Sequence, residues 1–342
     1  MTGAKPELSI VIPAYNDPIP LNRLLASIKR YAPPSVEVWV VDDGSSPPLK
    51  SQVEAQGFNY VFQNNQGPCG ARNFGATQAR ADALLFLDSD TEVLPDTIAK
   101  SLEIVRRPDF NVVTLVYHPQ SLGKSSASEF KGLFDAFVWV FRPAGPATEL
   151  CGQCSLFRKE AFFKTGGWSM IFHRPDMEHE EFSHRIKQHY TIMYYPGIMV
   201  KHQFPDFEKL VTSLFKRSIS WASLRMRGRV QFDDLRRTPA YAVVTLMPLT
   251  MVAVLASGFI FPHLWLVLGP LFIFYLIGNW PFFKYLVSEG GPWKGAIYVG
   301  HHFIISLAVG SGACLGSLSG ALRLMMQAFQ GPGTHAPGLL NK

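Results

Sequence analysis

Two aspartates one residue apart could hold a divalent cation. The segment Asp88-Ser89-Asp90 directly follows the apolar run Ala83–Leu87, so both carboxylates would leave a strand end on a tight turn. Carboxylate oxygens are hard ligands that suit Mg²⁺ or Mn²⁺, and the phosphates of a substrate would complete the coordination shell. A solvated turn has the same composition, so the pair indicates a site only together with other clusters.

Two other polar clusters also come after apolar runs. Tyr15-Asn16-Asp17 follows Leu8–Pro13, and Asp42-Asp43 follows Val36–Val41. The intervening segments have apolar residues at helical spacing, and strands that alternate with helices predict an α/β fold with a mostly parallel sheet. Since ligands bind such sheets at the carboxyl ends of the strands, the clusters are expected to meet at one site.

The predicted elements of this first part are short. The predicted strands are Leu8–Pro13, Val36–Val41, Tyr60–Phe62, Ala83–Leu87 and Val112–Tyr117. The predicted helices run from Leu21 to Tyr31, from Gly67 to Arg80 and onward from Pro95.

The last third of the chain has a different composition, because charges nearly vanish after Arg237. Three uncharged runs follow, and each has the roughly 20 residues that cross a bilayer core as a helix. They are Ala240–Phe261, His263–Phe283 and Gly295–Leu322. We expect the first two to form a tight hairpin at Pro262, either spanning or re-entrant. The third carries Gly312, Gly316 and Gly320, a spacing suited to close helix packing. Core helices of a soluble protein are the weaker alternative.

Basic residues gather just before the apolar runs. Between Lys201 and Pro239 there are nine Lys or Arg and four Asp or Glu. Such a segment marks the cytoplasmic side of a membrane and attracts anionic lipid, so the net charge of +6 does not require a nucleic-acid partner. The start of the chain has no signal-peptide pattern, which places the first domain in the cytoplasm. Cys151 and Cys154 have metal or redox spacing, but no second such pair exists, which favours a structural role.

Several ordered motifs resemble the family 2 inverting glycosyltransferases of the GT-A fold. The resemblance covers about Leu8 to His202, and the basic segment with apolar spans resembles a membrane-bound subgroup. The motifs are Ser9–Asn16, Val41–Ser45, Asn65–Gly67 with Ala71–Asn73, Phe86–Asp90, Phe157–Phe162 with Gly166–Trp168, and Tyr195–His202.

The resemblance implies roles for individual residues. Pro13 and Tyr15 would line the pocket for the base, and Asp43 would hydrogen-bond that base, with uracil favoured over guanine or thymine. Arg72 would lie near the nucleotide, where a helix start also favours an anion. Asp88 would lie near the ribose or the sugar. Asp90 and His202 would bind the divalent cation.

The proton acceptor departs from the family pattern. In the family it is usually the Asp of a Glu-Asp pair upstream of an Arg. Counting back from Arg185 places Glu178 at the Glu and His179 at the Asp. Histidine can act as a base near neutral pH, so His179 is one candidate. A shifted register makes Glu180 or Glu181 the base, and a solvated acidic helix start would make the segment non-catalytic.

These observations predict a cytoplasmic GT-A domain at 1–205, a basic amphipathic interfacial linker at 206–238, a transmembrane region at 239–323 and a tail at 324–342. The predicted function is metal-dependent transfer of a sugar from a nucleotide-sugar donor to a lipid-linked or polyprenyl-linked acceptor, in a bacterial-type inner membrane. A glycan-polymerising synthase and a weakly active or inactive membrane scaffold are the alternatives. A Gln-x-x-Arg-Trp motif, usual in processive relatives, is absent.

Overall fold

The computed structural model describes residues 4–151, 154–174, 176–226 and 238–329. The chain divides into two compact units, and the first contains residues 1–122 and 138–203. The second contains residues 123–137 and 204–339. Parts of the predicted linker (227–237) and tail (330–342) lie outside the described residues.

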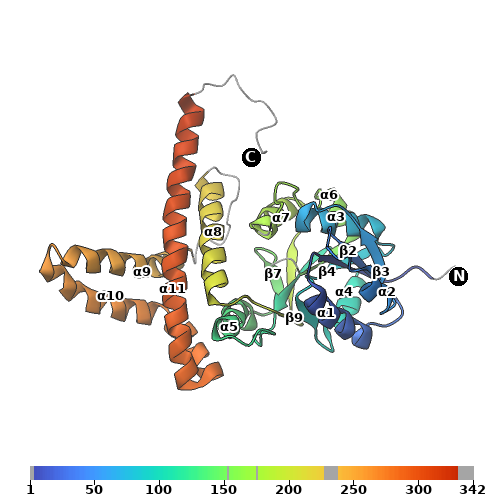
Figure 1. Ribbon diagram of the computed structural model, residues 1–342, viewed down its shortest axis with the longest axis horizontal. Helices are drawn as coiled ribbons and strands as arrows, with labels where there is room; N and C mark the ends of the chain where they lie inside the picture. Colours follow the sequence, from blue (N-terminus) through green and yellow to red (C-terminus); the bar gives the residue numbers. More distant parts are fainter. Residues whose placement is uncertain (1–3, 152–153, 175, 227–237, 330–342) are drawn as a thin grey trace. The chain divides into compact units, whose positions relative to one another are not determined.

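The first unit is built around one mixed sheet (Figure 1), which has nine strands among the described residues, in the order β3-β2-β1-β4-β8-β6-β9-β5 with β7 beside β9. The strands are β1 (Leu8–Ala14), β2 (Val36–Asp42), β3 (Asn59–Phe62), β4 (Ala83–Phe86), β5 (Thr91–Val93), β6 (Val112–Tyr117), β7 (Gly145–Ala147), β8 (Ser155–Arg158) and β9 (Ile192–His202). The helices of this unit are α1 (Pro18–Tyr31), α2 (Lys50–Glu54), α3 (Gly67–Gln78), α4 (Thr97–Val105), α6 (Lys159–Lys164) and α7 (Glu178–Ile186).

The α/β prediction is confirmed, and the sheet is less parallel than expected. The strands β3, β2, β1 and β4 are parallel neighbours, as the alternating pattern indicated. Beyond β4 the sheet is mixed, because β8 is antiparallel to both β4 and β6, and β9 is antiparallel to β5 and β7. All five predicted strands form within about one residue of their expected bounds.

Helices cover both faces of this sheet, with α3, α6 and α7 on one face and α1 on the other (Figure 1). The close fit of α3 depends on Gly75, where a Cβ atom would lie 2.4 Å from Cγ1 of Val11 and 2.8 Å from Cγ2 of Val41. Side chains of β1 and β2 therefore fix how near α3 approaches the sheet. This approach brings Arg72, one turn earlier on α3, to the carboxyl end of β4.

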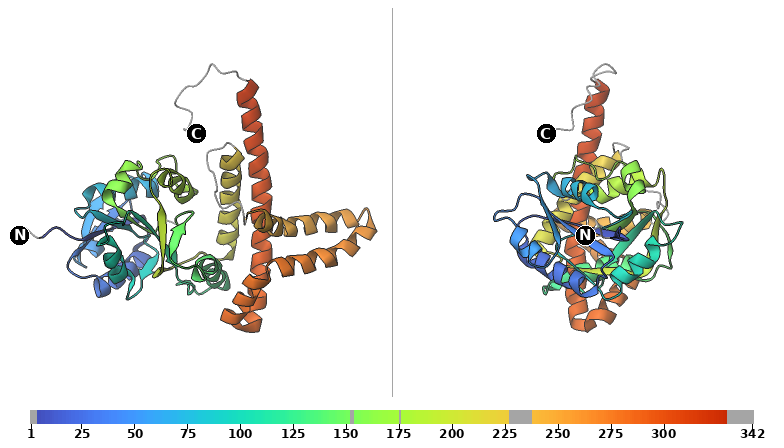
Figure 2. Two further views of the ribbon diagram at one scale, coloured as in Figure 1. Left: turned by 180° about the vertical axis from the view of Figure 1, so that it is seen from behind. Right: turned by 90° about the vertical axis from the view of Figure 1, so that its right-hand side faces the viewer.

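The second unit consists of helices. Its elements are α5 (Ser126–Val140, continuing into the first unit), α8 (Phe207–Met226), α9 (Thr238–Gly258), the short 3₁₀ helix η1 (Pro262–Leu264), α10 (Trp265–Gly278) and α11 (Trp280–Phe329). The helices α9 and α10 form a hairpin, and α8 lies along α11 in both views (Figures 1 and 2). The helix α11 is kinked where Gly291 has a φ of +73° before Pro292.

Aromatic and aliphatic side chains from α5, α8, α9, α10 and α11 form the core of this second unit. Its polar groups are paired, since Tyr275 Oη lies 2.6 Å from Nδ1 of His302 and Tyr298 donates to Glu129 at 2.7 Å. Such pairing is expected inside an apolar bundle, where an unsatisfied polar group is costly.

One helix among the described residues, from Trp280 to Met326, is long and apolar enough to cross a membrane. The shorter apolar segments Val243–Gly258 and Pro262–Gly278 belong to the hairpin of α9 and α10. The hairpin at Pro262 forms as predicted. Whether three helices span the membrane stays a prediction.

Candidate active site

Asp88, Asp90 and His202 come together at one edge of the sheet. One ligand atom from each of the three side chains lies within 4.8 Å of the others. Antiparallel pairing of β5 with β9 sets Thr91 opposite His202, and Nε2 of His202 lies 3.3 Å from Oδ1 of Asp90. Burial is the largest influence on Asp90 and raises its pKa, but the neighbouring His202 outweighs it and the pKa falls below its usual range. Two carboxylates and an imidazole form a donor set that suits a divalent cation.

Arg72 forms an ion pair with this cluster. Its Nη2 donates to Oδ1 of Asp88 at 2.6 Å, and the Arg72 side chain is almost fully buried. The guanidinium also stacks 5.2 Å from the ring of Trp168. Nε and Nη1 of Arg72 are buried without a hydrogen bond to any described residue. The charge of Arg72 is therefore paired with the Asp88 carboxylate, and Arg72 contacts the cluster through Asp88.

The carboxyl ends of β1 and β2 carry the predicted base-binding residues. Pro13 is buried in β1 opposite Val41, whereas Tyr15 just beyond the strand is 52% exposed. An exposed aromatic ring at this edge is available for stacking. Asp43 is buried, and its Oδ1 accepts hydrogen bonds from Nε2 of Gln63 (2.7 Å) and from the backbone N–H of Gln66 (2.8 Å).

Asp42 organises the loop that carries Asp43, a role that the sequence did not reveal. Its carboxylate accepts bonds from the backbone N–H groups of Ser45 (2.8 Å) and Leu49 (2.9 Å) and from the hydroxyl of Tyr60 (2.8 Å). Burial raises the pKa of Asp42, but these hydrogen bonds outweigh burial and hold it below the usual range. Asp42 therefore stabilises the loop, and the role predicted for its neighbour Asp43 in binding the base stays a prediction.

Glu178 and Glu181, two of the predicted base candidates, are engaged in the fold of α7. Oε2 of Glu178 accepts the backbone N–H of Asp176 at 2.6 Å, and this side chain is buried. Burial raises the pKa of Glu178, but His179 and Arg72 outweigh it, so the carboxyl stays ionised. Glu181 forms a two-point ion pair with Arg185 at 2.6 and 2.8 Å. Both carboxylates are therefore poorly disposed to take a proton from a substrate.

His179 and Glu180 form a second pair at the start of α7. Nε2 of His179 lies 3.0 Å from Oε1 of Glu180, and both side chains are about 15% exposed. Because a carboxylate only accepts hydrogen bonds, a hydrogen bond at this contact would be donated by the Nε2–H of the ring.

Two family motifs predicted from the sequence meet in the structure. The side-chain oxygen of Asn73 accepts the backbone N–H of Trp168 at 2.9 Å, and its amide donates to the Trp168 carbonyl at 2.8 Å. Trp168 also packs edge-on against Phe86 of β4, with ring centroids 6.1 Å apart. The two motifs therefore support the strand that ends at Asp88.

The two cysteines with metal spacing are placed differently. Cys154 is fully buried at the start of β8, and burial raises the pKa of its thiol well above the usual range. The backbone N–H of Cys151 donates to Oγ1 of Thr114 at 2.7 Å. Neither cysteine belongs to the cluster of metal-ligand atoms found among the described residues.

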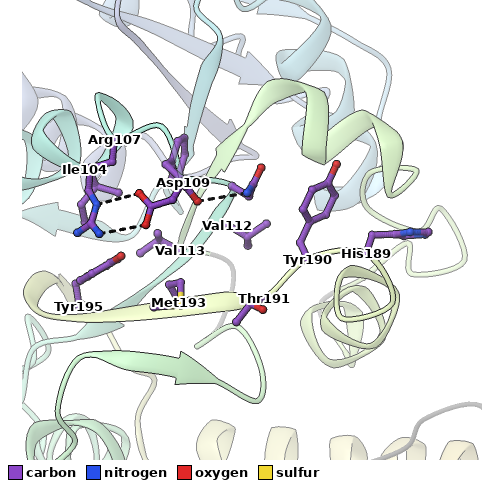
Figure 3. Close-up of a pocket in the computed structure, with 12 residues that line it drawn as sticks. Ile104, Arg107, Asp109, Val112, Val113, His189, Tyr190, Thr191, Met193 and Tyr195 are labelled. Carbon is purple, nitrogen blue, oxygen red and sulfur yellow. Dashed lines mark hydrogen bonds and ion pairs between the residues drawn. The ribbon is translucent and has the colours of Figure 1, made fainter.

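A cavity of about 280 Å³ lies elsewhere in the first unit, where β6 and β9 begin (Figure 3). Arg107 and Asp109 pair with each other on one side of it, and Tyr195 lies beside Arg107 (Figure 3). Tyr190 stands on the opposite side. Because β6 and β9 are parallel, this cavity lies at the strand ends opposite His202. None of the predicted site residues lines it.

Comparisons with known proteins agree with this geometry. A sequence model of the family described as Glycosyl transferase family 2 matches residues 9–166. An uncharacterized glycosyltransferase of Haemophilus influenzae is 30% identical over 179 residues, covering 47% of this chain and 56% of that protein. The poly-beta-1,6-N-acetyl-D-glucosamine synthase of Staphylococcus aureus is 25% identical over 254 residues, covering 69% of this chain and 60% of that protein. The chain thus spans little more than half the length of these relatives.

Among solved structures, the mannosyltransferase PcManGT of Pyrobaculum calidifontis, determined with GDP-Man and Mn²⁺, is similar with a TM-score of 0.55 at 13% identity. The similarity covers 94% of this chain and 88% of that one, and at this identity it establishes the fold alone. The ordered motifs, the GT-A sheet and the match to residues 9–166 lead to one conclusion: the first unit contains a glycosyltransferase domain of family 2.

Proposed function

We propose that this protein transfers a sugar from a nucleotide-sugar donor to a lipid-linked acceptor, with inversion at the anomeric carbon and with a divalent cation. The observation that carries the proposal is the convergence of Asp88, Asp90 and His202 at the sheet edge where the motifs for the nucleotide end. The donor set fits Mg²⁺ or Mn²⁺. When bound, such a cation neutralises diphosphate charge and stabilises the leaving nucleotide.

The residues of the chain would bind the donor in an ordered way. Tyr15 stacks on the base and Asp43 accepts a hydrogen bond from it, with a uridine nucleotide favoured. Pro13 closes the base pocket, Asp88 lies by the ribose or the sugar, and Arg72 acts by holding Asp88 in place. These assignments follow the family pattern, and the exposure of Tyr15 and the burial of Arg72 are consistent with them.

An inverting transfer also needs a group that removes the proton of the acceptor hydroxyl while its oxygen attacks the anomeric carbon. Among the candidates on α7, we assign this step to His179. Glu178 and Glu181 hold other hydrogen bonds, and Glu180 is the partner of the histidine. Histidine can act as a base near neutral pH, as an inverting transfer requires.

The proposal of a lipid acceptor is based on the helices of the second unit. The helix α8 begins at Phe207, shortly after His202, and alternates apolar side chains with Lys209, Lys216 and Arg217. Basic residues next to an apolar span attract the anionic lipid of the cytoplasmic leaflet. Together with the span candidate Trp280–Met326, this helix supports an integral protein of a bacterial-type inner membrane with its catalytic domain in the cytoplasm.

A glycan-polymerising synthase is the second candidate. It is favoured by the similarity to the Staphylococcus synthase, which extends over 69% of this chain and so beyond the family domain. The missing Gln-x-x-Arg-Trp motif speaks against it. The mass of the product separates the two, because a single transfer adds one sugar to the lipid and a synthase gives a ladder of masses.

The proposal can be tested with full-length protein in lipid nanodiscs. Uridine and guanosine diphosphate sugars are supplied with extracted membrane lipid, in Mn²⁺, in Mg²⁺ or in chelator. We expect transfer to lipid that requires the cation and is lost in Asp90→Asn. The matched control is Asp96→Asn, since Asp96 is an exposed aspartate paired with Lys100. Transfer that persists in chelator and in Asp90→Asn would refute the cation site, and transfer only to soluble acceptors would refute the lipid acceptor. Nucleotide binding without turnover of any donor would favour the scaffold alternative.

A further inference from the structure

The side chain of Gln63 lies against Asp43, although nothing in its sequence context marks it as a site residue. Gln63 directly follows β3, and its backbone N–H continues the ladder to β2 by donating to the carbonyl of Asp42 at 3.0 Å. Its buried side chain donates from Nε2 to Oδ1 of Asp43 at 2.7 Å. Because a carboxylate only accepts hydrogen bonds, this contact also fixes the amide with its nitrogen toward Asp43.

The same oxygen of Asp43 has a second donor. The backbone N–H of Gln66 donates to Oδ1 at 2.8 Å, so two hydrogen bonds occupy the two lone pairs of this atom. None of the residues that the structure describes donates to the other oxygen, Oδ2. The carboxylate therefore keeps one oxygen that can accept a hydrogen bond from a ligand.

The backbone places this carboxylate at the same edge of the sheet as Tyr15. Ala14 and Asp42 are paired residues of β1 and β2, and the backbone N–H of Asp43 donates to the carbonyl of Ala14 at 2.9 Å. Tyr15 and Asp43 thus each follow directly after one of two paired residues. A base that stacks on the exposed ring of Tyr15 would have Asp43 as a neighbour.

The helix α3 packs against both donors. A Cβ atom at Gly70 would lie 2.8 Å from Cβ of Gln66 and 3.6 Å from Nε2 of Gln63. The glycine therefore allows α3 to approach the loop that carries the two glutamines. This packing holds both donors in place on Oδ1.

We propose that Gln63 determines which base the donor site accepts. Together with the N–H of Gln66, Gln63 occupies Oδ1 of Asp43, so the base meets a single acceptor, Oδ2. The site then takes nucleoside diphosphates whose base carries one ring N–H between two carbonyl groups, which is the N3–H of uracil or thymine. This inference rests on the proposed function, in which Asp43 binds the base. Gln63 acts through Asp43 and is therefore a positioning residue.

Other bases do not match a single acceptor. Guanine presents two adjacent donors, N1–H and the exocyclic N2–H, and one of them would stay unpaired at this carboxylate. Cytosine presents N3 as an acceptor, which would face the acceptor oxygen of Asp43. An unpaired donor or acceptor in a binding site costs free energy, so both nucleotides should bind less tightly.

The first measurement is nucleotide binding, which needs no turnover. Full-length protein in nanodiscs is titrated calorimetrically with UDP, GDP and CDP in Mn²⁺. The three ligands share the ribose and the diphosphate, so the ratio of their Kd values reports the base alone. We expect UDP to bind about tenfold more tightly than either of the others, the effect of one hydrogen bond. Equal affinities for UDP and GDP would overturn the proposal.

Asp43→Asn is the sharpest variant, because it changes one acceptor and keeps the shape of the side chain. Gln63 and Gln66 both donate at the position of Oδ1, so they require an oxygen there. The introduced amide nitrogen then takes the place of Oδ2 and donates hydrogen bonds. We expect the preference to reverse, with CDP bound about tenfold more tightly than UDP. A variant that still prefers UDP would contradict the proposed role of the two donors.

Gln63→Leu removes one donor and frees a lone pair of Oδ1 for the second N–H of guanine. We expect the advantage of UDP over GDP to fall about tenfold. A purely structural role would weaken both nucleotides equally, and an unchanged ratio of the two Kd values would count against the proposal. Gln188→Leu is the matched control, since Gln188 is an exposed glutamine just after α7, and both Kd values should stay unchanged.

The transfer assay separates this inference from the proposed function. Selective binding of UDP by a protein that turns over no donor would refute the transferase function and leave the role of Gln63 intact. Efficient transfer from a guanosine diphosphate sugar, with GDP bound as tightly as UDP, would support the transferase function and overturn the role of Gln63.

Discussion

The contact between α8 and α11 depends on glycines, and substitution of Gly316 is the sharpest perturbation of it. A Cβ atom at Gly316 would lie 2.3 Å from the carbonyl oxygen of Ile219 and 2.9 Å from Cβ of Ala222. The first contact is with backbone, so it can be relieved only by moving α8 as a whole. Overpacking of this kind costs about 1–3 kcal/mol.

Gly300 on the same helix provides a matched control, because a Cβ atom there would meet nothing within 4 Å. Replacing a helical glycine by alanine stabilises a helix by up to about 1 kcal/mol in both cases. The propensity gain therefore cancels when Gly316→Ala is compared with Gly300→Ala. The difference in the free energy of unfolding isolates the clash and should be about 1–3 kcal/mol.

The assay is thermal unfolding of the full-length variants in nanodiscs, followed by tryptophan fluorescence at one scan rate. A cost of 1 kcal/mol lowers Tm by about 2–4 °C for a unit of this size, so Gly316→Ala should melt several degrees below Gly300→Ala. Equal melting temperatures would show that α8 does not pack on this face of α11. The packing argument would then be wrong.

Two further predictions concern buried charges in the first unit. Burial raises the pKa of Glu37, but its hydrogen bonds to Ser9 and to Arg80 outweigh burial and lower the pKa. The contribution of Glu37 to the free energy of unfolding is therefore complete above the unfolded pKa of about 4.3, and it is lost as the pH falls through the folded pKa. The unfolding free energy of Glu37→Gln should thus lie below that of the wild type at pH 7 and converge with it in acid, whereas a gap independent of pH would exclude this cause. Arg72→Met should cost about 3–5 kcal/mol because it leaves Asp88 without its buried partner. Arg106→Ala removes an exposed ion pair and should change the midpoint of the same urea titration far less.

The sequence predicted the first half of the sheet well because that half is encoded locally. A run such as Leu8–Ala14 is apolar on both faces, and this pattern is typical of a strand that helices cover on both sides of the sheet. Short elements of the second half were missed, including β5 (Thr91–Val93) and β7 (Gly145–Ala147). Three-residue strands have no periodicity of their own, and they form here because β9 offers edges on which they can pair.

The candidate site was also predictable from the sequence only in part. The Asp88-Ser89-Asp90 turn and His202 are recognisable as motifs, and the structure brings them together. The partners of the motif residues were not recognisable, because each lies far along the chain. The backbone N–H of Leu150, for example, donates to the hydroxyl of Ser183 on α7, and nothing in the residues around Leu150 indicates that contact.

The Arg72–Asp88 pair explains how two carboxylates can lie close together in the folded chain. Oδ1 of Asp88 accepts from the guanidinium, and Oδ1 of Asp90 lies near the imidazole of His202, so each carboxylate has a positive or polar partner from the protein. The cost of the like-charge contact is reduced before any cation binds. The same pairing weakens the attraction of the cluster for a free cation, since part of its negative charge is already compensated. A divalent ion held by one or two carboxylates gains most of its remaining ligands from substrate phosphates. A cluster balanced in this way is therefore suited to hold its cation together with the nucleotide rather than alone.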